Sequence, residues 1–171
     1  NKTLSGNVTR MASPAVTSER VYVSTGSTDP TGGRLYAINR TAGTTEWTVE
    51  YPHWSERAPA VADEVVYTTS QDCEESCEQT YTRPDGKIWA FNAETGSELW
   101  NYTTEEYVGS APAVSDGKLF IQNGNEELLS IDNTGDDTPS GGVVNQSASS
   151  ITPTTATADE STTYNIEIRI K

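Results

Sequence analysis

The sequence predicts an all-β protein built from β-propeller-type blades, and three observations support that prediction. A strand–turn–strand segment at residues 33–47 recurs 53 residues later at 86–100, and a shorter copy follows at 127–135. The same Pro-Ala-Val motif precedes each copy. One more short apolar run lies between each motif and the copy that follows it. Four short strands repeated at a period of roughly 40–50 residues are typical of a propeller.

The strands of one repeat are clearest in the second copy. After the Pro-Ala-Val strand, Val65–Tyr67 forms the second predicted strand. The third, Ile88–Phe91, is aromatic and β-branched, which is the composition that strands favour. Asn92 and Gly96 then supply turn chemistry, through a side-chain acceptor and a residue free to take positive φ. Trp100 opens the fourth strand with a large ring to bury.

The third copy is incomplete, and the chain changes character after it. A Trp follows the turn Gly by four residues in the first two copies, whereas Pro139 takes that place in the third. Pro cannot donate to a strand ladder, so we expect about three blades, the last without an ordinary outer strand. A polar Ser/Thr/Gly-rich linker and one alternating C-terminal strand complete the prediction. The predicted units are repeats at 1–135 (blades at about 11–51, 52–104 and 107–135), the linker at 136–162 and the strand at 163–171.

The charge balance restricts the class of partner. Acidic residues number 25 against 11 basic ones, for a net charge of −14 in 171 residues. This balance argues against nucleic acid as a partner, because neutralising phosphates needs clustered Lys and Arg. The acidity predicts a halophilic source, with simple solubility as the alternative. No run reaches the ~20 apolar residues of a membrane helix, and no signal segment opens the chain, so we expect a cytosolic, processed or partial protein.

Taken together, the motifs resemble a known family. Ala-Pro-Ala-Val, then Leu-Tyr-Ala-Ile-Asn or Ile-Trp-Ala-Phe-Asn, then Gly-x₃-Trp is similar to the PQQ-like β-propeller repeat. That repeat occurs in quinoprotein dehydrogenases and in BamB-like outer-membrane assembly scaffolds. The resemblance covers about residues 11–135. It implies that Trp47 and Trp100 dock between neighbouring blades.

The resemblance does not by itself imply an enzyme. Quinoprotein enzymes use adjacent cysteines, a catalytic Asp and a calcium-bound quinone at the centre of a full propeller. This chain has no adjacent cysteines and no residue that matches the catalytic Asp. His53 is its one histidine, which argues against His-based triads and His-rich metal sites. We therefore expect no catalytic site, cofactor or metal. Asp132, Asp136 and Asp137 could together bind calcium, but we interpret them as ordinary turn-forming residues.

Cys73 and Cys77 are the two cysteines, in a polar stretch. A local disulfide is the favoured interpretation and requires an oxidising compartment. A metal site lacks further ligands nearby. Redox chemistry is disfavoured by the three-residue spacing and the flanking glutamates. Two free thiols are the remaining alternative.

Binding is therefore the predicted function. The blade-to-blade connections carry His53 and Trp54 in one repeat and Tyr107 in the next, and exposed aromatics there are candidate protein or glycan contacts. Blade packing is the structural alternative. Five Asn-x-Ser/Thr sequons favour a location outside the cell. They are Asn1, Asn7, Asn39, Asn101 and Asn145.

We accordingly predict a non-catalytic, extracellular or cell-surface scaffold that binds a protein partner. One alternative is a structural subunit of a surface assembly that self-associates by β-strand donation. A second alternative is a fragment of a quinoprotein dehydrogenase.

Overall fold

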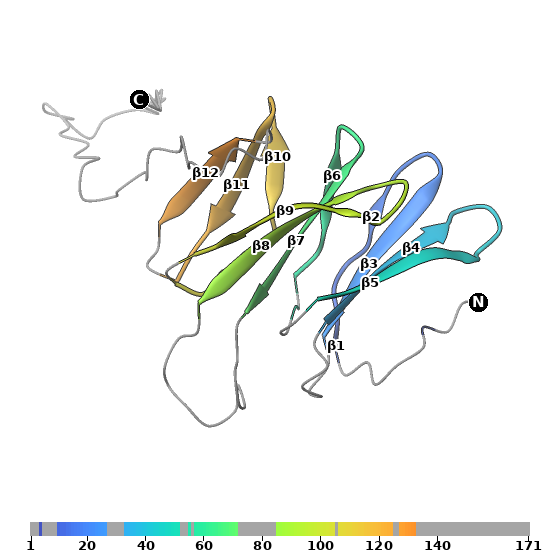
Figure 1. Ribbon diagram of the computed structural model, residues 1–171, viewed down its shortest axis with the longest axis horizontal. Helices are drawn as coiled ribbons and strands as arrows, with labels where there is room; N and C mark the ends of the chain where they lie inside the picture. Colours follow the sequence, from blue (N-terminus) through green and yellow to red (C-terminus); the bar gives the residue numbers. More distant parts are fainter. Residues whose placement is uncertain are drawn as a thin grey trace, which may run out of the picture.

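Three antiparallel β-sheets stand side by side like blades of a fan in the computed structural model (Figure 1). Every regular element within the described part of the chain is a β-strand. The prediction of an all-β fold with propeller-type blades is confirmed. The structure describes residue 4 and residues 10–26, 33–51, 55, 57–71, 85–104, 106–124 and 127–132. The predicted linker and C-terminal strand lie outside these residues.

Blade 1 is the first sheet, in which β3 pairs with β4 and β4 with β5. Its strands are β1 (Arg10–Met11), β2 (Ala15–Val16), β3 (Arg20–Gly26), β4 (Gly33–Asn39) and β5 (Thr45–Tyr51). Both β1 and β2 pair with the same edge of β3. They therefore act as one strand that is interrupted at the Ser-Pro pair, where Pro14 has no N–H to donate.

Blades 2 and 3 repeat this order. Blade 2 contains β6 (Ala60–Ala62), β7 (Val65–Gln71), β8 (Gly86–Asn92) and β9 (Glu98–Thr103). Blade 3 contains β10 (Ala113–Ser115), β11 (Lys118–Gln122) and β12 (Leu128–Asp132). The first strands of neighbouring blades touch, β2 against β6 and β6 against β10. These strands therefore lie toward the centre of the fan, and the strand order puts β5 and β9 at the opposite edge of their sheets.

The turn before each outer strand is built by one asparagine. The side-chain oxygen of Asn39 accepts hydrogen bonds from the backbone N–H groups two and three residues further on, at 3.0 and 2.8 Å. Asn92 makes the same two bonds in blade 2, at 3.0 and 2.9 Å. Gly43 and Gly96 end these turns with φ values of +68° and +73°. Glycine adopts this left-handed conformation without steric cost, which explains the repeated Asn and Gly.

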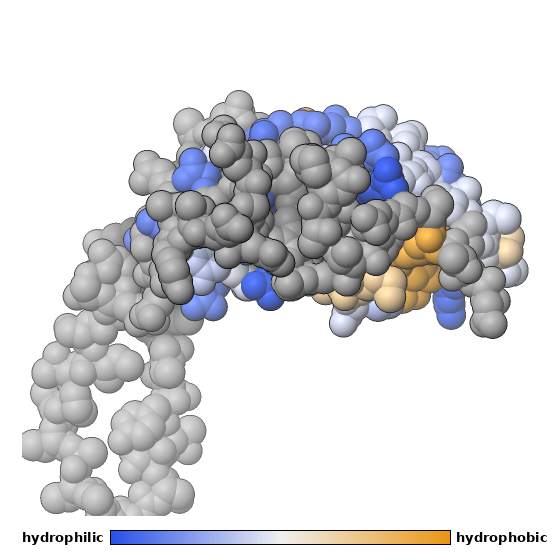
Figure 2. Space-filling model, turned by 90° about the horizontal axis from the view of Figure 1, so that it is seen from below, coloured by the Kyte–Doolittle hydropathy of each residue, from blue (hydrophilic) through white to orange (hydrophobic). Residues whose placement is uncertain are grey.

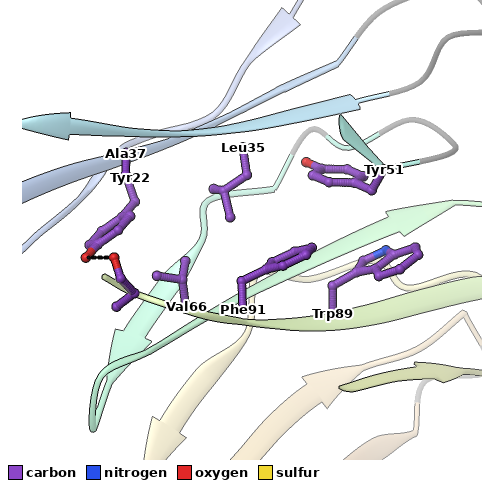
Figure 3. Close-up of a cluster of buried hydrophobic side chains, with 8 residues drawn as sticks. Tyr22, Leu35, Ala37, Tyr51, Val66, Trp89 and Phe91 are labelled. Atoms are coloured by element: carbon purple, nitrogen blue, oxygen red, sulfur yellow. Dashed lines mark hydrogen bonds between the residues drawn. The ribbon is translucent and has the colours of Figure 1, made fainter. Parts of the chain in front are cut away.

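The core between blades 1 and 2, called the first interface, is aromatic (Figure 3). Blade 1 contributes Tyr22, Leu35, Ala37 and Tyr51, and blade 2 contributes Val66, Trp89, Phe91 and Ala93. The rings of Trp89 and Phe91 stack with centroids 6.2 Å apart, and Tyr51 lies 6.0 Å from Trp89. Because each sheet alternates its side chains between two faces, each blade can bury two apolar faces only between two neighbours.

The second interface, between blades 2 and 3, uses smaller side chains at several of the same repeat positions. Blade 2 contributes Tyr67, Ile88 and Ala90, and blade 3 contributes Leu119, Ile121 and Ile131, with Val108 from the connection between the two blades. Trp100 packs against this cluster, with its ring centroid 6.0 Å from that of Tyr67. Both interfaces are thus filled by side chains that come from separate sheets.

Trp47 lies at the outer edge of the first interface and rests on the turn of blade 2. Its indole N–H donates to the carbonyl oxygen of Ala93 at 3.1 Å. The Tyr22 hydroxyl donates to the same oxygen at 3.0 Å, so two side chains of blade 1 hold one carbonyl of blade 2. A Cβ on Gly96 would lie 2.8 Å from the Trp47 ring, which requires glycine there for a second reason.

Alanine substitution of the two outer-strand tryptophans should destabilise the chain strongly. Trp47→Ala and Trp100→Ala each remove a ring that packs between blades, and we expect each to lower the free energy of unfolding by about 3 kcal/mol. Leu99→Ala is the matched control, because Leu99 is 50% exposed on β9 and should change stability by about 0.5 kcal/mol or less. Urea titration followed by tryptophan fluorescence measures all three. Similar small losses for the three variants would contradict the packing described here.

The two turn glycines give a second, finer comparison. Gly96→Ala and Gly43→Ala both place a Cβ at positive φ, which costs about 1 kcal/mol each. Only Gly96 also faces a ring, whereas no atom lies within 4 Å of a Cβ built on Gly43. We therefore expect Gly96→Ala to lower the melting temperature clearly more than Gly43→Ala. Equal melting temperatures would mean that Trp47 does not rest on this turn.

Candidate functional site

The connection from blade 2 to blade 3, here residues 104 and 106–110, carries the candidate contact residue Tyr107. Thr104 anchors the start of this connection to β8. Its backbone N–H donates to the Gly86 carbonyl at 2.8 Å, and its hydroxyl oxygen accepts the Gly86 N–H at 3.1 Å. The Gly86 N–H also reaches the Glu106 carbonyl at 3.0 Å. The path of the chain is therefore set just before Tyr107.

Tyr107 itself is held from the side of blade 3. Its carbonyl accepts the Gly124 N–H at 2.8 Å. A Cβ on Gly124 would come within 2.3 Å of the Tyr107 ring, so the ring lies directly on this glycine. Tyr107 is half-buried. The repeat pattern of the sequence indicated Tyr107 but missed Gly124 and Thr104. The Asn-Gly pair at 123–124 is the signal that could have indicated Gly124.

Asn123 closes the neighbouring turn between β11 and β12. It is buried, its amide donates to Glu127 at 2.8 Å, and its side-chain oxygen accepts the Glu127 N–H at 3.0 Å. Two acidic residues lie in the adjoining segments. Glu106 directly precedes Tyr107 in the chain, and Glu127 follows the turn that contains Gly124. The arrangement is an aromatic ring on a rigid support with acidic residues in the segments beside it. Such a surface can contact a partner, and aromatic rings supply contact area at low entropic cost.

Hydroxyl groups line the inner part of the first interface. Ser24 and Thr68 share a hydrogen bond of 3.1 Å, and the Trp89 indole donates to Ser70 at 2.9 Å. The hydroxyls of Tyr51 and Ser55 are buried there without a hydrogen-bond partner. Of these two bonds, only that between Ser24 and Thr68 joins the two sheets, and all of these groups are neutral hydroxyls or an indole.

Two of the five sequon asparagines lie among the described residues. The Asn39 amide donates to Glu46 at 2.8 Å, and this bond, with Arg20 as the second cause, lowers the pKa of Glu46. Both polar atoms of the Asn39 side chain are therefore engaged in the turn and in this contact. The Asn101 amide donates to Glu98 at 2.6 Å. The other three sequons lie outside the described residues.

The described residues do not form a metal centre. No group of three His, Cys, Asp or Glu side chains in the described ranges comes close enough to hold a metal ion. Asp132 instead pairs with Lys118 at 2.7 Å. We therefore derive no metal or cofactor chemistry from the described residues. The remaining candidates, His53, Trp54, Cys73, Cys77, Asp136 and Asp137, lie outside the described residues.

Comparison with known families decides the relationship of the chain. The family model described as "Outer membrane protein assembly factor BamB" matches residues 3–137 and, overlapping with these, residues 78–164. The chain belongs to this family. The resemblance to PQQ-like repeats is thereby confirmed for most of the chain. No curated protein matches this BamB-family chain. The described residues contain no helix that is long and apolar enough to cross a membrane.

Solved structures similar to this BamB-family chain include three dehydrogenases. A europium-containing methanol dehydrogenase matches with a TM-score of 0.57 at 18% identity, over 77% of this chain and 25% of that one. The quinohemoprotein alcohol dehydrogenase ADHIIG from Pseudomonas putida HK5 gives 0.51 at 18% identity, over 74% and 25%. The quinohemoprotein alcohol dehydrogenase from Comamonas testosteroni gives a TM-score of 0.53 at 13% identity, over 78% of this chain and 28% of that one. The likeness at these identities shows the fold, and the chain spans about a quarter of each dehydrogenase.

Buried tyrosines make the blades less stable at alkaline pH. Burial raises the pKa values of Tyr22 and Tyr51, and it raises the pKa of Tyr67 to about 12. An unfolded chain releases tyrosine protons near pH ~10. Between these values the unfolded state binds fewer protons than the folded state, so stability falls as pH rises.

We therefore expect the melting temperature to fall between about pH 10 and pH 12 and the fall to be shallower in Tyr67→Phe, which removes one titrating hydroxyl. Calorimetric scans of both proteins from neutral to alkaline pH give the comparison. The same slope in both proteins would show that Tyr67 is not the group that titrates.

Proposed function

We propose that this chain is a non-catalytic β-propeller module that binds a protein partner as a scaffold, outside the cell or at the cell surface. The observation that carries the proposal is Tyr107 on its rigid connection. Its ring rests on Gly124 and its backbone is bonded to blade 3. Membership of the BamB family supports a role in protein interaction, since the family description names an assembly factor.

The geometry suits binding for a physical reason. An aromatic ring that is already held in place loses little conformational freedom when a partner covers it. Aromatic side chains of this kind dominate the energetics of protein interfaces. The equivalent position of the preceding repeat, 53 residues earlier, is Trp54, next to His53. The proposed contact surface thus contains one aromatic residue per blade connection.

The proposed location outside the cell rests on the sequence. The sequons, the Cys73–Cys77 pair as a proposed disulfide and the excess of acidic residues all favour it. Net charge −14 further favours a halophilic source, because molar salt screens the repulsion among surface carboxylates. Of the two described sequons, both engage their amides in side-chain contacts, so a glycan at either would first have to break one of these bonds.

A fragment of a quinoprotein dehydrogenase is the second candidate. Its support is the shared fold of the three dehydrogenases, each about four times the length of the matched segment. This candidate requires calcium and a quinone, whereas the scaffold requires neither. Titration with pyrroloquinoline quinone and calcium separates the two, because bound quinone absorbs light and an active dehydrogenase reduces a dye when alcohol is added.

A binding comparison tests the scaffold. A cell-envelope extract from the source organism is passed over immobilised wild-type chain, Tyr107→Ala and Leu99→Ala. We expect the wild type and Leu99→Ala to retain the same protein, and Tyr107→Ala to retain at least about tenfold less of it. Tyr107→Phe, which keeps the ring on Gly124, should retain most of it. Equal recovery by all variants, or quinone binding with alcohol-dependent dye reduction, would contradict the proposal.

A further inference from the structure

A group of hydroxyl-bearing side chains is buried between blades 1 and 2. Ser24 on β3 and Thr68 on β7 are fully buried, and the hydrogen bond between them joins the two blades. Tyr51 ends β5, and Ser55 lies in the connection that follows. These four residues are called the hydroxyl cluster. Figure 2 shows hydrophilic residues and one apolar patch on the underside of the molecule, whereas Tyr51 and Ser55 are 1% and 2% exposed and so lie beneath the surface.

Two members of the hydroxyl cluster are unbonded within the described part of the chain. The hydroxyl oxygens of Tyr51 and Ser55 are buried there without a hydrogen-bond partner. Figure 3 shows the Tyr51 hydroxyl on the side of Leu35, which is the cross-strand neighbour of Ser24, so this hydroxyl points into the interface. Burial raises the pKa of Tyr51, and the other three hydroxyls of the cluster oppose that rise. They are therefore near the Tyr51 oxygen, although none of them bonds it directly.

Unbonded hydroxyls at this depth are costly. A buried polar group that has left water and found no partner destabilises the folded state, and the great majority of buried polar side-chain atoms have one. Polar groups that lie near each other without a direct bond are often bridged by water. A buried water needs about two to four polar partners. The hydroxyl cluster supplies that number from both blades and from the connection between them.

The second interface is apolar at the equivalent positions. Val108 and Ile121, which follow Ser55 and Thr68 by 53 residues, are both buried among apolar side chains. Thr69 lies next to Thr68 on β7, so its side chain alternates onto this side of the strand. Its hydroxyl also has no hydrogen-bond partner within the described part of the chain. A single hydroxyl among apolar groups does not supply the several partners that a water needs.

We propose that the hydroxyl cluster binds one ordered water molecule between blades 1 and 2. The Tyr51 hydroxyl donates to the water oxygen. The water donates one hydrogen to Ser55 and the other to the bonded pair of Ser24 and Thr68, since hydroxyl oxygens have two lone pairs each. Both unbonded hydroxyls are thereby satisfied, and blade 1, blade 2 and their connection are joined at one point.

The water has the role in the first connection that Thr104 has in the second. Thr104 fixes the start of the connection from blade 2 to blade 3 by its bonds to Gly86. Tyr51 occupies the same repeat position, 53 residues earlier, and Ser55 directly follows Trp54 in the chain. A water that joins Ser55 to both blades therefore holds the connection that carries the candidate contact residue Trp54.

The sign of a stability change tests the water. Tyr51→Phe keeps the ring and removes only the hydroxyl. We expect it to lower the melting temperature at neutral pH, because a satisfied hydrogen bond is lost, whereas removing an unsatisfied hydroxyl would relieve a desolvation cost. Thr69→Val is the matched control and should not lower the melting temperature. An unchanged or higher melting temperature for Tyr51→Phe would overturn the proposal, as would an equal fall for Thr69→Val.

A crystal structure of the whole chain, at a resolution that shows ordered water, locates the molecule directly. We expect one density peak about 3 Å from the oxygens of both Tyr51 and Ser55. The peak should be missing in the double variant Tyr51→Phe with Ser55→Val, which takes its valine from the equivalent Val108. A direct hydrogen bond between Tyr51 and Ser55, or no peak in the wild type, would overturn the proposal. Neither measurement involves a protein partner, so this proposal and the scaffold can fail separately.

Discussion

The contact on which the rest of the structure depends is the one between an outer-strand tryptophan and the turn of the next blade. Trp47 and Tyr22 both donate to the carbonyl oxygen of Ala93, and the Trp47 ring covers Gly96. This contact sets where blade 2 sits against blade 1, and so brings the alternating faces of two sheets into register. Trp47 also packs against the aromatic first interface, which joins the same two blades.

This constraint explains why one repeat is not a stable unit. A four-stranded sheet with two apolar faces exposes both of them when it stands alone. Burial of Val66, Ile88, Phe91 and Leu119 depends on a neighbouring blade in every case. Stability in such an array is a sum over the blades and the interfaces between them.

The same architecture separates stability from function. The spaces between the blades are filled by apolar and aromatic side chains and neutral hydroxyls, whereas the connection from blade 2 to blade 3 carries Glu106 and Tyr107. Tyr107 can therefore change without loss of the core, while Trp47 cannot. A fold of this kind supports many functions, because a connection varies independently of the interfaces that hold it.

The sequence by itself determined the repeat, the strand order within each blade and the turn chemistry, because these depend on residues close together in the chain. The 53-residue period, the Asn and Gly of each turn and the outer-strand Trp are all local patterns. Only the tertiary structure decided what those residues touch. It showed that Gly96 lies under the Trp47 ring of the preceding blade, that the Asn39 amide donates to Glu46, and that the Tyr107 ring lies on Gly124. The contact from Trp47 to Ala93 spans 46 positions, and such contacts leave no local pattern because they arise only when separate sheets pack face to face.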